Sequence, residues 1–230
     1  MIMVTITGIP MITRTRTVMT DADLLTLTHW LSPVFPVGGY AYSQGLETAI
    51  AEGDVTDSTS LIDWLELTLT DGSGQSDAIF LTTAMAADAD YRTLNAWAAA
   101  LAPSAERWQE TSEQGAAFTR AVNDLRDENE PAVALPIAVG RAARGLDLAP
   151  HRVAALYLQS LIATLVTGAV RHIPLGQAAG QKIIAALQPT ILAVAENARG
   201  KTPIDIRSAT FGADRASILH ETQETRIFRT

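Results

Sequence analysis

The chain has 230 residues, of which 47% are hydrophobic and 18% charged, the composition of a globular protein with a sizeable core. It contains no cysteine, which excludes disulfides, a thiol nucleophile and cysteine-ligated zinc or iron–sulfur sites, and which fits a reducing, cytoplasmic location. The formal net charge of −8 argues against a nucleic-acid-binding protein, because such a protein needs a basic face to neutralise phosphates.

Residues 1–20 predict a flexible N-terminal extension. Its first twelve residues are apolar and β-branched, but no basic residue precedes them, so they make a poor signal peptide. Met19 is a candidate translation start, since Thr20 and Asp21 form a fair helix opening. We therefore expect the folded domain to begin at residue 21.

Helical periodicity dominates from there onward. After the candidate N-caps Asp57 and Ser58, apolar residues recur at the i, i+3, i+4 and i+7 spacing of one helix face. Pro150 suits the first turn of a long helix, which Pro174 ends. Predicted helices cover residues 24–31, 40–52, 57–69, 78–87, 94–101, 104–125, 132–144, 150–172 and 176–187. No βαβ alternation appears, so we expect an all-α, single-domain bundle of about eight to ten helices over residues 21–202.

Residues 153–170 form an uncharged run at the lower limit of a membrane span. Gln159, Ser160 and Thr164 dilute its hydrophobicity, so we interpret it as a helix buried in a soluble bundle. A membrane-associated protein that spans at this run is the alternative.

The first polar cluster covers residues 32–47. Pro33 and Pro36 should end the preceding helix, and Gly38 with Gly39 permits a tight turn. A hydrophobic core needs none of the tyrosines and polar residues that follow, which indicates a shaped surface. The candidate partner-binding residues here are Tyr40, Tyr42, Ser43, Gln44 and Glu47.

The second cluster covers residues 171–181. A helix ends at Arg171, proline and glycine turn the chain, and Gln177 and Gln181 follow four residues apart on one side of the next helix. The cluster is either a well-capped corner between two helices or a polar groove for a partner, with Arg171, Gln177 and Gln181 as candidate contacts.

The third cluster is the C-terminal end. We expect residues 203–230 to form a tail that is mobile until it docks onto a partner or onto the body of the chain. Aromatic and arginine side chains are common interface anchors, and an Ile-Phe pair stands between two arginines here. The candidate binding residues are His220, Glu221, Gln223, Arg226, Phe228 and Arg229.

The sequence lacks the usual enzyme motifs. It has no phosphate-binding P-loop, no G-x-G-x-x-G and no G-x-S-x-G. Its four histidines form no metal-binding pair, and the spaced pair Glu106 and Glu110 is typical of a solvated helix face. We predict no catalytic, cofactor or metal residue, and Ser43 is best read as a helix cap. A small hydrolase built on Ser43, His172 and an acidic residue, and a nickel chaperone, are the rival hypotheses.

The three clusters, in this order, resemble the urease accessory protein UreF family. Residues 35–47 match its LP-x-G-x-[FY]-x-x-S-x-G-[LM]-E motif, residues 171–181 its R-x-x-P-L-G-Q-x-x-G-Q corner, and residues 220–230 its terminal H-E-T-Q-x-x-R-[IL]-F-R-[ST]. Phe35 replaces the usual leucine, and Leu219 stands where a basic residue is common.

The resemblance implies a non-catalytic, all-α accessory protein that needs no cofactor and forms a homodimer. It implies binding of the UreD/UreH accessory protein through residues 220–230 and recruitment or regulation of the GTPase UreG, so that nickel enters apo-urease. By the same resemblance, residues 40–47 and the corner at 171–181 would shape the dimer and the GTPase platform, with no nucleic-acid or membrane partner.

Overall fold

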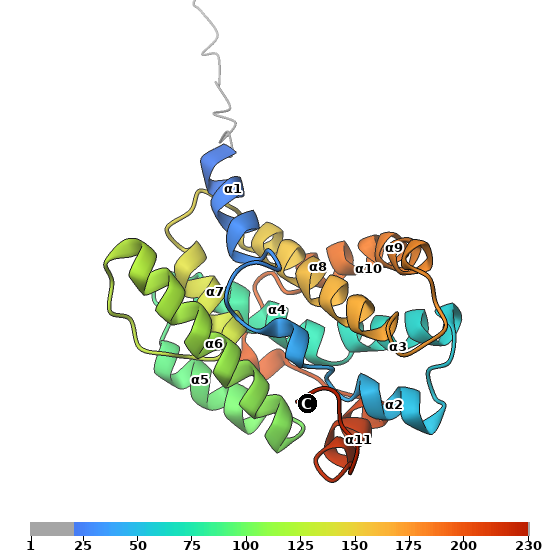
Figure 1. The fold of residues 1–230 in the computed structure, drawn as a ribbon. Helices are drawn as coiled ribbons and strands as arrows, with labels where there is room; N and C mark the ends of the chain where they lie inside the picture. Colours follow the sequence, from blue (N-terminus) through green and yellow to red (C-terminus); the bar gives the residue numbers. More distant parts are fainter. Residues whose placement is uncertain (1–20, 230) are drawn as a thin grey trace, which may run out of the picture.

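The computed structural model describes residues 21–229, a set of α-helices joined by short connections (Figure 1). No strand occurs in this part of the chain, which confirms the predicted all-α class. Leu187 alone separates α9 from α10, and counting this pair as one helix brings the bundle within the predicted number. The predicted extension, residues 1–20, lies outside the described residues, as does Thr230. The elements are α1 (Asp21–Trp30), η1 (Gly39–Ala41, a 3-10 helix), α2 (Leu46–Glu52), α3 (Ser58–Thr70), α4 (Ser73–Ala84), α5 (Tyr91–Ala100), α6 (Ala105–Arg126), α7 (Leu135–Ala143), α8 (Pro150–Ala169), α9 (Gln177–Ala186), α10 (Gln188–Asn197), η2 (Pro203–Asp205, also 3-10) and α11 (Phe211–His220).

Three helix starts follow directly from the local sequence. The Asp57 carboxylate accepts hydrogen bonds from the Thr59 and Ser60 amides at the start of α3, each at 2.9 Å. Ser104 caps α6 in the same way, and Pro150 occupies the first turn of α8. A helix start leaves backbone N–H groups unpaired. The Asp57 and Ser104 side chains accept hydrogen bonds from such groups, and Pro150 has no N–H to leave unpaired.

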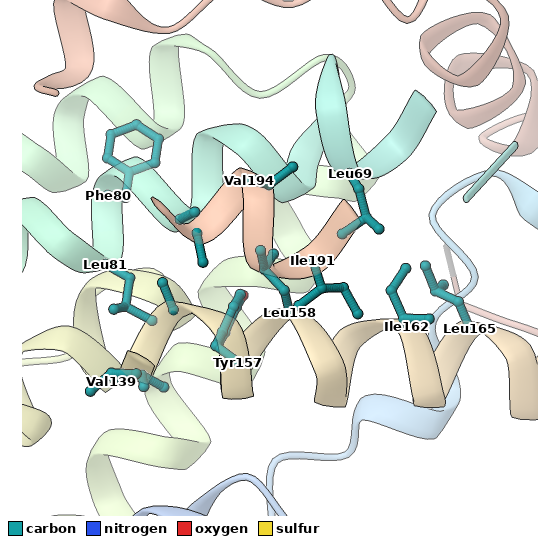
Figure 2. Close-up of a cluster of buried hydrophobic side chains, with 14 of the residues drawn as sticks. Leu69, Phe80, Leu81, Val139, Tyr157, Leu158, Ile162, Leu165, Ile191 and Val194 are labelled. Carbon is teal, nitrogen blue, oxygen red and sulfur yellow. The ribbon is translucent and has the colours of Figure 1, made fainter. Parts of the chain in front are cut away.

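α8 is the central helix of the bundle and packs against α4, α9 and α10 (Figures 1 and 2). Its buried residues Leu158, Ile162 and Leu165 face a cluster that includes Leu69 and Ile191. Full burial of such a side chain contributes about 1.5–3 kcal/mol each, so α8 contributes much of the stability of the core.

Two helical stretches, Pro150–Ala169 and Gln177–Asn197, are long and apolar enough to cross a membrane by length and composition alone. The first is α8, one face of which, including Val153, Leu158 and Val166, is buried against the neighbouring helices. This packing favours the core-helix interpretation over the membrane-span alternative.

The segment that we expected to be a mobile tail is folded onto the rest of the chain. η2 packs against α4, and α11 packs against α2 and α6. The last described residues then reach η1 and α8, through a backbone hydrogen bond from Arg229 to Ala41 and the ring of Phe228 beside Gly168.

Candidate functional site

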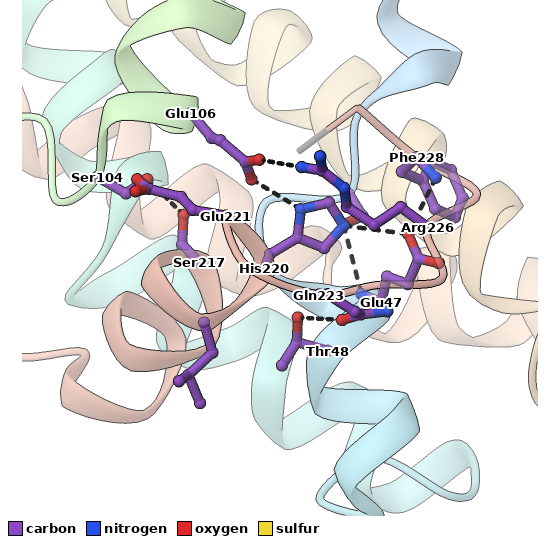
Figure 3. A network of polar contacts seen from close by, with 12 residues as sticks. Glu47, Thr48, Ser104, Glu106, Ser217, His220, Glu221, Gln223, Arg226 and Phe228 are labelled. Carbon is purple, nitrogen blue, oxygen red and sulfur yellow. Dashed lines mark hydrogen bonds and ion pairs between the residues drawn. The ribbon is translucent and has the colours of Figure 1, made fainter.

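The C-terminal residues are held by Glu47, near the N-terminus of α2 (Figure 3). One carboxylate oxygen of Glu47 accepts a hydrogen bond from the Ile227 amide at 2.8 Å, and the other accepts one from the Phe228 amide at 2.9 Å. Burial would raise the pKa of Glu47, but these amides and His220 outweigh it and lower the pKa below its ordinary value. Glu47 is therefore an ionised anchor for the end of the chain.

His220 joins two helices through both of its ring nitrogens. Its Nε2 lies 3.1 Å from Glu47 of α2, and its Nδ1 lies 2.7 Å from Glu106 of α6. The ring is completely buried, and each of its nitrogens lies within hydrogen-bonding distance of a carboxylate oxygen. Arg226 completes the cluster by pairing with the second oxygen of Glu106 at 2.7 Å. Charges in the interior are tolerated only when paired in this way. We call residues 220–229, bound to Glu47 and Glu106, the C-terminal latch.

The remaining latch residues also contact the body of the chain. Gln223 accepts a hydrogen bond from the Thr48 hydroxyl at 2.9 Å, and Glu221 accepts one from the Ala105 amide at the start of α6 at 2.9 Å. The ring of Phe228 lies 5.3 Å from that of His172, centroid to centroid. The third and second sequence clusters therefore meet at this aromatic pair.

Tyr42 and Arg229 form the outer edge of the latch. The Tyr42 hydroxyl donates to Glu113 of α6 at 2.7 Å, and Arg229 pairs with the same carboxylate at 2.9 Å. Burial and the hydrogen bond to Glu113 raise the pKa of Tyr42 to about 12, so this hydroxyl keeps its proton near neutral pH.

The turn before α2 differs from the predicted helix over residues 40–52. Gln44 and Gly45 both have positive φ, at 54° and 80°, so the regular helix begins only at Leu46. A Cβ added at Gly45 would lie 2.6 Å from the Ser217 amide nitrogen, which shows how closely this turn approaches α11. Ser43 is buried, and its hydroxyl accepts a long hydrogen bond of 3.4 Å from the Glu47 amide, whereas the N-cap position of α2 is held by Gly45.

Gln44 leads from this turn into a buried polar network that sequence analysis missed. Its amide donates to Glu110 of α6 at 3.1 Å, and Arg107 lies 3.1 Å from Asp77 and 3.5 Å from Glu110. Tyr157 of α8 donates to Asp77 at 2.8 Å. Burial raises the pKa of Asp77 and of Glu110 even though Arg107 lies beside both.

The expectation that Glu106 and Glu110 lie on a solvated helix face was therefore wrong. Both carboxylates are buried, because α11 and the turn at Gln44 cover that side of α6. The sequence contained a signal for this burial. A spacing of four residues places Glu106, Glu110 and Gln114 on the same helix face as the large apolar side chain of Phe118.

Four of the predicted contact residues lie on the surface outside the latch. Arg171, Gln177 and Gln181 are exposed at the corner between α8 and α9, and the Tyr40 side chain is 45% exposed. Tyr40, with Gln44 and Glu110, lines a cavity of about 290 Å³ beneath the loop that follows α1. The structure thus joins the first and third clusters directly, and the second meets the third at the ring pair of His172 and Phe228.

Within residues 21–229, no group of three or more acidic or histidine side chains is arranged to hold a metal ion. The polar residues described above bind other parts of the same chain. Together, the fold and the site define the protein as an all-α bundle whose C-terminal segment is bound to its own body.

Comparison with known proteins identifies the family. The sequence pattern of the UreF family matches residues 55–188. Proteins described as urease accessory protein UreF are similar over most of their length. The one from Jannaschia sp. (strain CCS1) is 48% identical over 90% of this chain and 94% of its own. Those from Dinoroseobacter shibae and Paracoccus denitrificans are each 47% identical, over 91% and 93% of this chain and 99% of their own.

The chain belongs to the UreF family of urease accessory proteins. The resemblance inferred from the three clusters is therefore confirmed, and the chain is an accessory protein and not a catalytic enzyme. Family membership implies partners within the urease accessory complex in general.

Proposed function

We propose that this chain is an adaptor in urease maturation. It binds a UreD/UreH-type accessory protein and recruits or regulates a UreG-type GTPase, so that nickel is inserted into apo-urease. The observation that carries this proposal is the C-terminal latch, which gathers residues from two of the three family motifs at one place. The side chain of Ile227 is 69% exposed there although its amide is bound to Glu47, so the docked end still presents an apolar side chain outward.

An adaptor of this kind acts through differences in affinity. It couples the nucleotide state of a GTPase to nickel release only if it binds one state more tightly than the other. The latch supports such a role because residues 220–229 are docked on the body of the chain without a partner. A partner that docks on the ordered latch is spared the conformational entropy cost of ordering those residues.

Co-purification tests this proposal. The full chain, a chain without residues 219–230, and Glu47→Gln are each mixed with UreD-like and UreG-like proteins. We expect the truncated chain to lose the UreD-like protein, and Glu47→Gln to bind it more weakly because its end is no longer anchored. Glu52→Gln is the matched control, since Glu52 is an exposed residue of the same helix paired with Arg215 at the surface. Unchanged association of the truncated chain would contradict the proposal.

Two further parts of the proposal have their own measurements. The adaptor does not bind GTP, so calorimetric titration of the purified chain with GTP should show no tight binding. It acts as a homodimer in the cytoplasm, which sedimentation velocity and cell fractionation test. A strictly monomeric chain at micromolar concentration, or its recovery with membranes after carbonate extraction, would contradict these assignments.

A further inference from the structure

Three arginines line a cavity that the C-terminal latch does not reach. Arg126 comes from the last turn of α6, Arg141 from α7, and Arg144 directly follows α7. The cavity has a volume of about 390 Å³, and Glu128 and Glu130 are the acidic residues in its lining. The lining carries three positive and two negative charges, so the cavity favours an anion.

Among the three arginines, Arg141 combines burial with a nitrogen that lacks a hydrogen bond. Its side chain is only 10% exposed, and its Nη1 is a buried nitrogen that makes no hydrogen bond. The guanidinium also stacks over the ring of Tyr91, 5.5 Å from its centroid, and Nη2 donates to the Thr119 hydroxyl at a long 3.4 Å. A buried guanidinium with an unused donor is costly, and an anion with oxygens at hydrogen-bonding distance would remove that cost.

Glu130 occupies the place of such an anion. Its Oε2 lies 3.3 Å from Nη1 of Arg141, close enough for ion pairing but without hydrogen-bond geometry. The side chain of Glu130 is 49% exposed, so it can swing into solvent. Its backbone stays fixed meanwhile, because the Asn123 side chain binds both its carbonyl and its amide, at 3.0 and 3.1 Å.

The other two arginines are also available to a ligand. Arg126 lies over the Trp30 ring and donates one hydrogen bond, to the Ala142 carbonyl at 3.1 Å. Arg144 is exposed and donates to the Tyr91 hydroxyl at 3.4 Å. Each guanidinium has five donors in a planar fork, so both retain donors for an oxyanion.

We propose that this cavity binds the phosphate dianion of a small molecule, either free phosphate or a phosphate monoester, which displaces the Glu130 carboxylate from Arg141. An incoming ligand must compete with a carboxylate that is tethered beside the arginine and therefore present at high effective concentration. A dianion competes better than another monocarboxylate, because it brings more charge and more acceptor oxygens to the three guanidiniums.

Calorimetric titration of the full chain tests the proposal, with inorganic phosphate, adenosine monophosphate and acetate as probes at matched ionic strength. Glu130→Gln removes the internal competitor and should tighten phosphate binding by about tenfold, whereas Arg144→Gln should weaken it by about tenfold. Arg120→Gln is the control, since Arg120 is exposed on α6 and lies outside the lining. Circular dichroism shows whether these surface variants keep the fold.

One-to-one phosphate binding that responds in this way supports the proposal. Tighter binding of adenosine monophosphate than of phosphate identifies a phosphate ester as the ligand, and equal or weaker binding identifies free phosphate. Three results would overturn it: no saturable binding to the natural chain or to Glu130→Gln, acetate binding as tightly as phosphate, or equal weakening in Arg120→Gln and Arg144→Gln.

Discussion

The carboxylate of Glu47 and the imidazole of His220 meet in the interior at 3.1 Å, although 173 positions separate them in the chain. His220 has no exposed surface, and its second nitrogen is bound to Glu106. This contact ties the end of α11 to the first turn of α2. It is one of the buried contacts that hold the latch against the body of the chain.

Replacing Glu47 with glutamine should release the latch. The variant leaves His220 without one of its two carboxylates and weakens the hold on the Ile227 and Phe228 amides. We expect a loss of about 3 kcal/mol in the free energy of unfolding, the usual cost of removing one partner of a buried ion pair. Urea unfolding measures this loss, and amide hydrogen exchange at residues 227 and 228 should become faster. A loss no larger than that of the surface control Glu52→Gln would contradict this role for Glu47.

The latch should also weaken in acid. The pKa of Glu47 is lower in the folded chain than its ordinary value of 4.5, so the unfolded state takes up a proton first as the pH falls. The stabilisation by Glu47 is complete above pH 4.5 and disappears as the pH drops through the lowered pKa. The difference in unfolding free energy between the natural chain and Glu47→Gln, measured from pH 7 to pH 3, should shrink accordingly. A difference that stays constant over this range would refute the assignment.

Gly45→Ala should destabilise the protein more than Gly53→Ala. Both glycines have φ near +80°, at 80° and 85°, so both substitutions carry the cost of a left-handed alanine, about 1 kcal/mol. Only at Gly45 would the new Cβ also meet backbone, 2.6 Å from the Ser217 nitrogen, whereas nothing lies within 4 Å at Gly53. We expect an extra loss of at least about 1–3 kcal/mol at Gly45, as for other overpacked sites. Equal unfolding midpoints for the two variants would show that α2 does not press on α11.

Arg107→Leu should destabilise the core and make its stability fall more steeply as the pH rises. Without Arg107, Asp77 and Glu110 remain buried and lack their cation, which costs about 3–5 kcal/mol. Burial already raises the pKa of both carboxyls, and losing the cation raises it further, so the folded state holds their protons to higher pH. The stability of the variant should then fall as the pH rises from 4 toward 7. Urea unfolding at several pH values measures this, with Arg120→Leu at an exposed position of α6 as the control.

Much of the fold could be read from local sequence. Asp57, Ser104 and Pro150 mark helix starts through interactions with residues within one turn, and such local rules need no knowledge of the rest of the chain. The apolar run of α8 was equally visible, and its packing in the bundle shows how that run is used. The positive φ of Gln44, by contrast, delayed α2 beyond its predicted start, because tertiary contact with α11 determines the turn.

The features of the site likewise divide into those that local sequence predicts and those that depend on tertiary contacts. The all-α class, the resemblance to the UreF proteins and the three clusters of unusual polar residues can be read from the sequence, since motifs and periodicity are properties of neighbouring positions. The pairing of Glu47 with His220 and the Phe228 amide, the burial of Glu106 and Glu110, and the three arginines around one cavity appear only once the helices are packed together. Those relationships depend on which helix faces meet. Burial of apolar surface brings together helices that are far apart in the chain, and because this driving force is non-directional, the sequence of one helix does not reveal its partner.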